Sequence, residues 1–468
     1  MRSWRVLLMV LVWLGVLWLL RPVAQAQDVP APSAASVDLP PAIRRKLHPD
    51  LIRLLRSAPT TDRLRVQIVM REQIDLGVKR TRAALVADLQ AQAARSQAGV
   101  LARLDRAVRV NRAADVRPLW INNSIAAQID RDLLGEIAAR DDVALIKPDA
   151  YRQWIDPAWR STAAANLLSP TSGHRLPTSV EWGIAKIRAD MVWSALNVTG
   201  TGVVVANMDT GVDGQHPDLQ ESYRGYNPKG LPVHWGNWYD ATGLPSQYPY
   251  DAHGHGTHTL GTIVGGNGLG VAPGAKWIGV RIFDSSGGGL DSWIHAGFQW
   301  VLAPGGDPAR APDVVNNSWG TPIGAYAEYQ PDVQALNAAG IIAIFAAGNT
   351  GPGAGTIYAP GSYPEAFSVG ATDDEDVIAS FSSRGPSPFG PIKPEMVAPG
   401  VNVKSTFPGG GYAIGDGTSM ATPHVAGVVA LMKSAAPGLT IAEARYALTS
   451  TARRSISATY PGNSYGWG

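Results

Sequence analysis

The stretch Gly202-Val-Val-Val-Ala-Asn-Met208 runs directly into Asp209-Thr210-Gly211, and it decides the fold. A nearly continuous apolar run of this length predicts a strand buried on both faces, which is typical of parallel sheets covered by helices. Ligands of such sheets bind at the carboxyl ends of the strands, and Asp209 stands at that end. The stretch therefore predicts an α/β sheet with a carboxylate at its functional edge.

Further stretches of the same kind extend this prediction over residues 179–468, the C-terminal region. Apolar runs recur at 276–283, 313–316 and 340–347, and segments with helical spacing at 290–301 and 331–339 lie between them. The pattern predicts a mostly parallel, doubly wound sheet with helices on both faces. Asn349, like Asp209, falls just after a predicted strand.

Residues 27–155, the N-terminal region, have a different pattern of short alternating elements. Their size and element types predict a small α+β domain that is too small for a substrate cleft of its own. We expect strands at 64–70, 119–121 and 143–146 and helices at 82–108 and 130–140.

Residues 156–178, the linker, are rich in Pro, Ser, Thr and Ala and have no periodicity. Such composition predicts an exposed connection of the kind that proteases cut. We therefore expect processing within it.

The first 26 residues predict a signal peptide. Two arginines precede an apolar run at 6–20, and Ala24-Gln25-Ala26 has the small-x-small pattern of a cleavage site. A membrane anchor is the alternative, but about 15 apolar residues fall short of a roughly 30 Å hydrocarbon core. Export predicts a secreted protein, and with no cysteine its stability must come from its core or from bound ions. The membrane would be met only during export.

Charge is unevenly distributed along the chain. Residues 27–175 carry 23 basic and 16 acidic residues, whereas 176–468 carry 14 and 22. The first part has a net charge of +7 and the second of −8, although the whole chain has only +2. Opposite charge would favour docking of the two parts; chance surface composition is the alternative.

Three local motifs together predict nucleophilic catalysis. They are Met208-Asp209-Thr210-Gly211, then His255-Gly256-Thr257-His258, and then Gly417-Thr418-Ser419-Met420-Ala421-Thr422-Pro423. Singly, each has an ordinary explanation: a turn, a helix start or an N-cap serine. Together they supply a serine, a base that takes its proton and a carboxylate that orients the base. The chain order Asp, His, Ser is that of subtilisin-type enzymes.

At these residues the sequence resembles the subtilase family of serine proteases, especially its bacillopeptidase F-like branch. The resemblance covers about 180–468 and includes Gly270-Val-Ala-Pro-Gly-Ala-Lys-Trp277, Pro312-Asp-Val-Val-Asn-Asn-Ser-Trp-Gly320 and Tyr363-Pro-Glu-Ala-Phe-Ser-Val-Gly-Ala371. The N-terminal region resembles the subtilase propeptide in size and predicted elements.

The resemblance implies a secreted serine endopeptidase that works through an acyl-enzyme and is made as a self-processing zymogen. The N-terminal region would be its intramolecular chaperone and inhibitor, and the substrates would be polypeptides bound in extended conformation. Asn349 would serve the oxyanion hole, Ser318-Trp319-Gly320 would pair with the substrate backbone, and Tyr358 would line the primary specificity pocket and shorten it if its ring points inward.

Metal binding is the most open part of the sequence. Asp218 matches a family position that helps to bind calcium, but the loop Gly265-Gly-Asn-Gly-Leu-Gly270 is shorter than the family loop that wraps the ion. The acidic run at 373–376 is another candidate or an ordinary solvated face. No cofactor is required for the predicted chemistry.

Two other function classes remain as alternatives. The pattern His253-x-His255-x-x-His258 could chelate a divalent metal in a metal-dependent hydrolase. An inactive binding pseudoprotease is the second, although all four catalytic positions are present. We expect no nucleic-acid partner and a monomer. The sequence stops at Asn463-Ser-Tyr-Gly-Trp-Gly468, where relatives usually continue through a final helix, which raises the possibility of a truncated chain.

Overall fold

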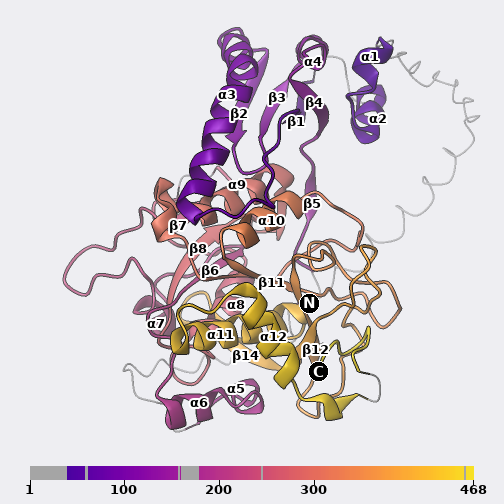
Figure 1. Ribbon diagram of the computed structural model, residues 1–468. Coiled ribbons are helices and arrows are strands. Elements are labelled where there is room, and N and C mark those ends of the chain that lie inside the picture. The colour runs from indigo at the N-terminus through magenta and orange to yellow at the C-terminus, as the bar shows by residue number, and fades with distance from the viewer. Residues whose placement is uncertain (1–39, 58–61, 157–158, 160–178, 244–245, 458–459) are drawn as a thin grey trace, which may run out of the picture.

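The computed structural model of the protein describes residues 40–57, 62–156, 159, 179–243, 246–457 and 460–468. The predicted signal peptide and most of the linker lie outside these residues. The N-terminal region, indigo in Figure 1, stands on the side of the C-terminal region where α9 and α10 lie. No helix among the described residues has both the length and the apolar character needed to cross a membrane.

The N-terminal region is an antiparallel sheet covered by helices. Its four strands have the order β2-β3-β1-β4. The central strand β1 (Leu64–Met70) alternates as predicted, and its buried side chains share a core with the long helix α3 (Arg82–Arg109) and with α4 (Arg131–Ala138). Asp130 caps α4 by accepting a hydrogen bond from the Leu133 N–H, 2.7 Å away. The remaining elements are α1 (Pro41–Arg44), α2 (Pro49–Ser57), β2 (Ala113–Leu119), β3 (Ser124–Ile129) and β4 (Val143–Pro148).

The predicted strand at 119–121 is correct only at Leu119, which ends β2 and pairs with Ser124 of β3. Residues 120–123 form the turn between these two strands. Asn123 adopts a left-handed conformation with φ of 46°, which asparagine tolerates better than most residues. The apolar pair Trp120 and Ile121 imitated a strand because it packs against the C-terminal region.

The C-terminal region confirms the predicted doubly wound sheet. Seven parallel strands have the order β13-β12-β11-β10-β6-β8-β7 (Figure 1). Strand β6 (Val204–Asp209) is central, and its last residue Asp209 lies beside Arg281 at the end of β8 (Lys276–Arg281). The other strands are β7 (Trp238–Asp240), β10 (Val314–Asn317), β11 (Ile342–Ala346), β12 (Phe367–Thr372) and β13 (Met396–Pro399).

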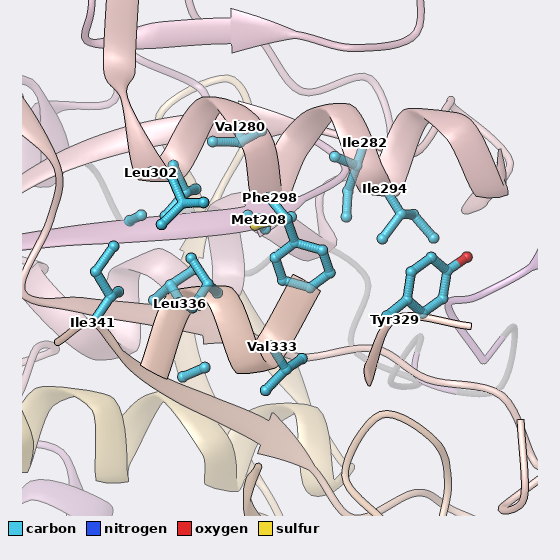
Figure 2. Close-up of a cluster of buried hydrophobic side chains, with 14 of the residues drawn as sticks. Met208, Val280, Ile282, Ile294, Phe298, Leu302, Tyr329, Val333, Leu336 and Ile341 are labelled. Atoms are coloured by element: carbon cyan, nitrogen blue, oxygen red, sulfur yellow. The ribbon is translucent and has the colours of Figure 1, made fainter. Parts of the chain in front are cut away.

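Helices cover both faces of this sheet, because alternate strand residues enter two different cores. Met208 packs with α9 (Asp291–Leu302) and α10 (Gln330–Ala338) in the cluster of Figure 2. Val205 instead packs with α8 (His255–Val264) and α11 (Thr418–Ala435) on the opposite face. The sheet is therefore held from both sides, which fixes the position of its carboxyl edge.

Smaller elements complete the C-terminal region. Residues 460–468 bond to the edge strand of the sheet, where the Val397 N–H donates to the Gly468 carbonyl at 3.0 Å. The remaining elements are α5 (Trp182–Lys186), α6 (Ala189–Leu196), α7 (Pro217–Gln220), β9 (Gly288–Leu290), the hairpin β14 (Val403–Phe407) and β15 (Gly411–Gly415), and α12 (Ile441–Thr451).

Candidate active site

Asp209 and His255 form a buried pair at the carboxyl edge of the sheet. Asp209 ends β6, and His255 is the first residue of α8. The Nδ1 atom of His255 lies 2.7 Å and 2.9 Å from the two carboxylate oxygens of Asp209. At these distances Nδ1 carries the proton and donates it, so Nε2 keeps its lone pair. The arrangement can therefore accept a proton at Nε2.

Glycine allows these two residues to come together. A Cβ atom on Gly256 would lie 2.1 Å from the carbonyl oxygen of Gly211, which is far inside van der Waals contact. Gly254, immediately before His255, has φ of 100°, a conformation that favours glycine. Because neither glycine has a side chain, α8 can begin close enough to β6 for His255 to form a hydrogen bond with Asp209.

Asp251 ties the loop of Asp209 to the helix of His255. Its buried carboxylate accepts five hydrogen bonds of 2.7–3.0 Å, from Thr210 Oγ1, from the N–H groups of His253, Gly254 and Thr257, and from Thr257 Oγ1. The sequence analysis missed this residue. Its signal was an aspartate four positions before a candidate histidine, in a loop too short to place it elsewhere.

Ser419 lies in the first turn of α11, beside the predicted substrate strand. Its hydroxyl donates to the Ser318 carbonyl at 2.8 Å, and the Ser318 hydroxyl donates to the Ser419 carbonyl at 2.9 Å. Nε2 of His255 is buried and has no hydrogen-bond partner in the described part of the chain. The structure thus joins Asp209 to His255 by hydrogen bonds, whereas the Ser419 hydroxyl is directed to a carbonyl.

Asn349 lies close to Ser419. It follows β11 through Gly348, whose φ is 109°. The side-chain oxygen of Asn349 accepts hydrogen bonds of 2.9 Å from both the N–H and the hydroxyl of Thr418. Because the oxygen is used in this way, the Nδ2 donor is left for another acceptor; it lies 3.5 Å from where a Cβ would stand on Gly417.

A segment of the chain itself occupies the cleft between two C-terminal segments. Strand β5 (Tyr151–Gln153) pairs antiparallel with β9 (Gly288–Leu290) on one side. On the other side the Gly320 N–H faces the Trp154 carbonyl at 3.4 Å. A Cβ on Gly288 would lie 2.1 Å from the hydroxyl oxygen of Tyr151, so the glycines of β9 permit this approach. Gly320, one of the predicted substrate-binding residues, therefore contacts extended backbone.

Trp154 anchors this segment by its side chain. The indole is almost fully buried and lies within 5.6–6.3 Å, centroid to centroid, of the rings of Phe283, Trp319 and Tyr329. Its Nε1 donates to the Gly289 carbonyl at 3.2 Å. Trp319 thus contributes to the cleft through its ring.

Trp159 covers the histidine pair from the linker side. Its ring centroid is 4.9 Å from that of His255, edge to face, and 5.6 Å from that of His253, stacked. The residue is 4% exposed. The residues around this tryptophan have no periodicity, and the linker prediction did not single it out.

Tyr358 points inward. Its N–H donates to the Ala347 carbonyl at 2.9 Å, and its ring lies against the backbone of Gly348 and Gly320. A Cβ on Gly348 would lie 2.3 Å from a ring carbon of Tyr358. Burial raises the pKa of the phenol. The ring therefore fills space between the segments that carry Asn349 and Gly320.

Asp218 does not have the surroundings of a calcium ligand. One carboxylate oxygen accepts a hydrogen bond from the Tyr412 hydroxyl at 2.6 Å, and the other accepts one from the side chain of Asn267. Both oxygens are thus turned to hydrogen-bond donors, whereas calcium requires six to eight oxygen ligands. The residues do not fit the ion. The acidic run at 373–376 forms surface contacts, with Asp376 paired to Lys186 and Arg453.

The three histidines of the metal alternative serve different contacts. Nε2 of His258 donates to the carbonyls of Val403 and Ala413 at 3.1 Å and 3.0 Å, and burial lowers its pKa to about 4. His255 is turned to Asp209. In the described part of the chain no group of three or more His, Cys, Asp or Glu residues is arranged to hold a metal ion.

Fold and site together define a class: doubly wound α/β proteins that place Asp, His and Ser, in that chain order, at the carboxyl edge of a parallel sheet. The model of the subtilase family matches residues 200–468, and the chain belongs to this family of serine peptidases. Subtilases hydrolyse peptide bonds of polypeptides by a catalytic triad without a cofactor. The predictions of fold, family and enzyme class are confirmed.

Individual relatives support the same assignment. The chain is 42% identical to "Bacillopeptidase F" of Bacillus subtilis (strain 168) over 407 residues, which are 83% of this chain and 28% of that protein. It is 36% identical to "Subtilisin E" of the same strain over 74% of this chain and 78% of that one. "Subtilisin Savinase" of Lederbergia lenta is 40% identical over 62% of this chain and 96% of its own length.

Proposed function

We propose that this chain is the zymogen of a secreted serine endopeptidase with Asp209, His255 and Ser419 as its catalytic triad. The observation that carries the proposal is the buried Asp209–His255 pair at the sheet edge, together with Ser419 at the start of α11, a helix that shares a core with the helix of His255. Residues 1–26 would direct export, and residues 27–155 would be the propeptide. The enzyme acts as a monomer, without nucleic acid and with membrane contact only during export.

The reaction is acyl transfer. His255 Nε2 takes the proton from the Ser419 hydroxyl, whose oxygen bonds to the carbonyl carbon of the peptide. Nδ2 of Asn349 and the backbone N–H of Ser419 stabilise the negative oxygen that forms. His255 then gives its proton to the leaving amine as the C–N bond breaks. Water next gives a proton to His255 as its oxygen bonds to the acyl carbon, and His255 returns that proton to Ser419 when the ester bond breaks.

In the zymogen the N-terminal region and the linker residue Trp159 block this site. Strand β5 occupies the extended backbone position between β9 and Gly320, and Trp159 covers the ring of His255. Ser419 meanwhile donates to the Ser318 carbonyl, so its proton is not available to His255. Cutting in the linker and release of the N-terminal region would free the cleft and the nucleophile.

Opposite charges support docking of the two regions. Lys147 of β4 pairs with Glu328 of the C-terminal region. Arg82 and Arg117 donate to the carbonyls of Ala339 and Ala241, both at 2.9 Å. The ion pair agrees in sign with the net charges of +7 and −8 along the sequence, whereas the two arginines bind uncharged carbonyls. Docking should therefore weaken with salt.

Tyr358 limits the primary specificity pocket in this proposal. Its ring lies against Gly348 and Gly320, where it would leave room for a small side chain only. Tyr358→Gly should therefore raise kcat/KM for peptides with a large aromatic residue before the scissile bond. Wild-type protein that already prefers such peptides, with no change in the variant, would contradict this role.

The triad is tested by Ser419→Ala in the full chain. The variant should neither hydrolyse casein nor process itself, and a fluorophosphonate probe should label the wild type at Ser419 only. Thr422→Ala, a change of another buried hydroxyl in the same helix, serves as the matched control for folding. Casein hydrolysis at the wild-type rate by Ser419→Ala would end the proposal. Loss of activity to chelators without probe labelling would favour a metal-dependent hydrolase.

A further inference from the structure

Arg152 of β5 reaches an acidic group that the catalytic chemistry does not use. Its Nε lies 3.7 Å from Oδ1 of Asp291, the first residue of α9. Its guanidinium carbon is 4.7 Å from the centroid of the Tyr326 ring, a cation–π distance. A guanidinium thus lies against a carboxylate and an aromatic face at once.

Asp291 is buried and held by hydrogen bonds. It is 2% exposed, and its two oxygens accept hydrogen bonds from the hydroxyls of Tyr329 at 2.6 Å and Tyr326 at 2.9 Å. A carboxylate removed from water is costly unless donors or a cation stabilise it. The two tyrosines supply neutral donors, and the only cation that an ion pair brings to Asp291 in the described chain is Arg152.

The segment that carries Arg152 lies as a substrate would. It is extended, pairs with β9, faces Gly320 and continues toward the residue that covers His255. Alternate residues of a strand point to the same side, so Arg152 and Trp154 both face the C-terminal region. Arg152 precedes Trp154 by two positions, and Trp154 fills the aromatic pocket of Phe283 and Trp319.

The surroundings become more acidic when the N-terminal region leaves. Glu328 is paired with Lys147 of the N-terminal region and, at 2.8 Å, with His295 of the C-terminal region. Release removes both Lys147 and Arg152. Glu328 then keeps His295; burial lowers the pKa of this imidazole, but the carboxylates of Asp332, at 3.0 Å, and Glu328 raise the pKa to about 10. Asp291, in contrast, keeps no ion-pair partner among the described residues. A cationic side chain of a substrate would restore the positive charge that Arg152 places beside Asp291.

We propose that Asp291, with the rings of Tyr326 and Tyr329, forms a subsite for a positively charged side chain, arginine in particular. This side chain lies two residues before the bulky aromatic residue that a bound polypeptide places against Trp319. The inference rests on the proposed function, because it takes the docked segment as a stand-in for substrate. It assigns the enzyme a preference for Arg-x-aromatic sequences upstream of the cut bond.

The test compares two internally quenched peptides cut by protein that was expressed as the full chain and has processed itself. One has the sequence of residues 149–159, and the other has glutamine in place of the arginine. The arginine peptide should have about tenfold higher kcat/KM at the same bond, as verified by mass spectrometry. Equal values in the wild type would overturn the inference, as would casein hydrolysis with neither peptide cut.

Asp291→Asn should bring this ratio close to one, since asparagine keeps an acceptor for the tyrosines but loses the charge. Asp284→Asn is the matched control, because Asp284 also meets the docked segment, through the Tyr151 hydroxyl at 2.8 Å, but not through an arginine. Its ratio should stay near ten. A ratio that survives in Asp291→Asn, or that falls equally in Asp284→Asn, would refute the role of Asp291.

The ratio should also depend on pH. Burial, and next the charge of Glu328, raise the pKa of Asp291 to about 6, whereas Arg152 and hydrogen bonds from Tyr326 and Tyr329 oppose the rise. The preference needs the ionised carboxylate, so it should be full at pH 8 and fall toward pH 5. Any effect of pH on the chemical step is common to both peptides and cancels in the ratio. If Ser419→Ala protein cuts the peptides as the wild type does, the proposed function has failed rather than the subsite.

Discussion

The two regions of the molecule bury polar groups in different ways. In the C-terminal region, Asp251 and Asp209 are enclosed by hydrogen bonds from neighbouring loops of the same region. The N-terminal region meets the C-terminal one through ion pairs such as Lys147–Glu328 and through inserted indole rings such as Trp154. Hydrogen bonds within one region are suited to holding a site in a fixed arrangement. Ion pairs and inserted rings between regions are suited to a contact that forms once and is then released. Substitutions confined to the N-terminal region should therefore leave the kcat of the C-terminal region intact once the two regions have separated.

The largest effect is expected at Asn349. Asn349→Ala should lower kcat by about 10²–10³, the range seen when one such amide donor is removed from a subtilisin. KM should change little, because the donor acts on the oxygen charge of the transition state. The measurement is steady-state kinetics on a peptide substrate after processing.

Asn123→Ala in the N-terminal turn is the counterpart of this change. That residue is also a buried asparagine, but it lies in the proposed propeptide, so kcat of the protein that remains after the proposed processing should be unaltered. If both variants lowered kcat alike, the separation of the two regions would be wrong.

Acid should destabilise the C-terminal region before the N-terminal one. Burial lowers the pKa of His258 and of His424 to about 4, below the roughly 6.5 of an unfolded chain. Below pH 6.5 the unfolded state binds more protons, so this stability is present above pH 6.5 and is lost as pH falls toward 4. Each histidine should reduce the folding equilibrium constant by up to about tenfold per pH unit.

Hydrogen exchange on the full-length Ser419→Ala protein would measure this. Amides of α11 should exchange faster at pH 5.5 than the intrinsic pH effect requires, while those of α3 should not. His48, the one histidine described in the N-terminal region, has 42% of its side chain exposed, unlike the fully buried His258, so His48→Gln should leave the result unchanged. Equal acceleration in both helices would show that they open as one unit.

The smallest effect is expected at Trp159. Removal of its ring should expose His255, so that diethyl pyrocarbonate modifies this histidine about fivefold faster in the Trp159→Ala, Ser419→Ala full chain. Trp120→Ala, which removes an indole of the N-terminal region away from His255, is the control. No change at His255 in the Trp159 variant, as judged by peptide mass mapping, would refute the covering role.

Much of the fold could be predicted because its signals are local. Apolar runs ending in Asp209 and before Asn349 define strands and their carboxyl ends without any knowledge of tertiary contacts. The chain order of the three motifs then restricts the family. The prediction of a strand through 120–121 failed for the opposite reason. Trp120 packs against the C-terminal region, and this distant contact cannot be recognised from the local sequence.

The site residues that could not be predicted from the sequence are those whose role depends on contacts between distant segments of the chain. Asp291 stands at a predicted helix start, and only the docked Arg152 identifies its position in the cleft. Trp159 is an isolated aromatic residue in a segment without periodicity. Asp251 could have been found, because its spacing from His255 is short, but the number of its donors is a property of the folded loops.

The five hydrogen bonds to Asp251 make one side chain decisive for two loops. A single acceptor binds both the turn after Asp209 and the entry to the helix of His255. The direct bond from the Gly256 N–H to Thr210 Oγ1 also depends on it, because Asp251 holds the same threonine hydroxyl. Sequence change between residues 210 and 257 is thereby restricted to positions that leave these donors in place. The exposed loop at 227–232, which lies within this interval but supplies none of the five donors, has the freedom to vary in length and composition.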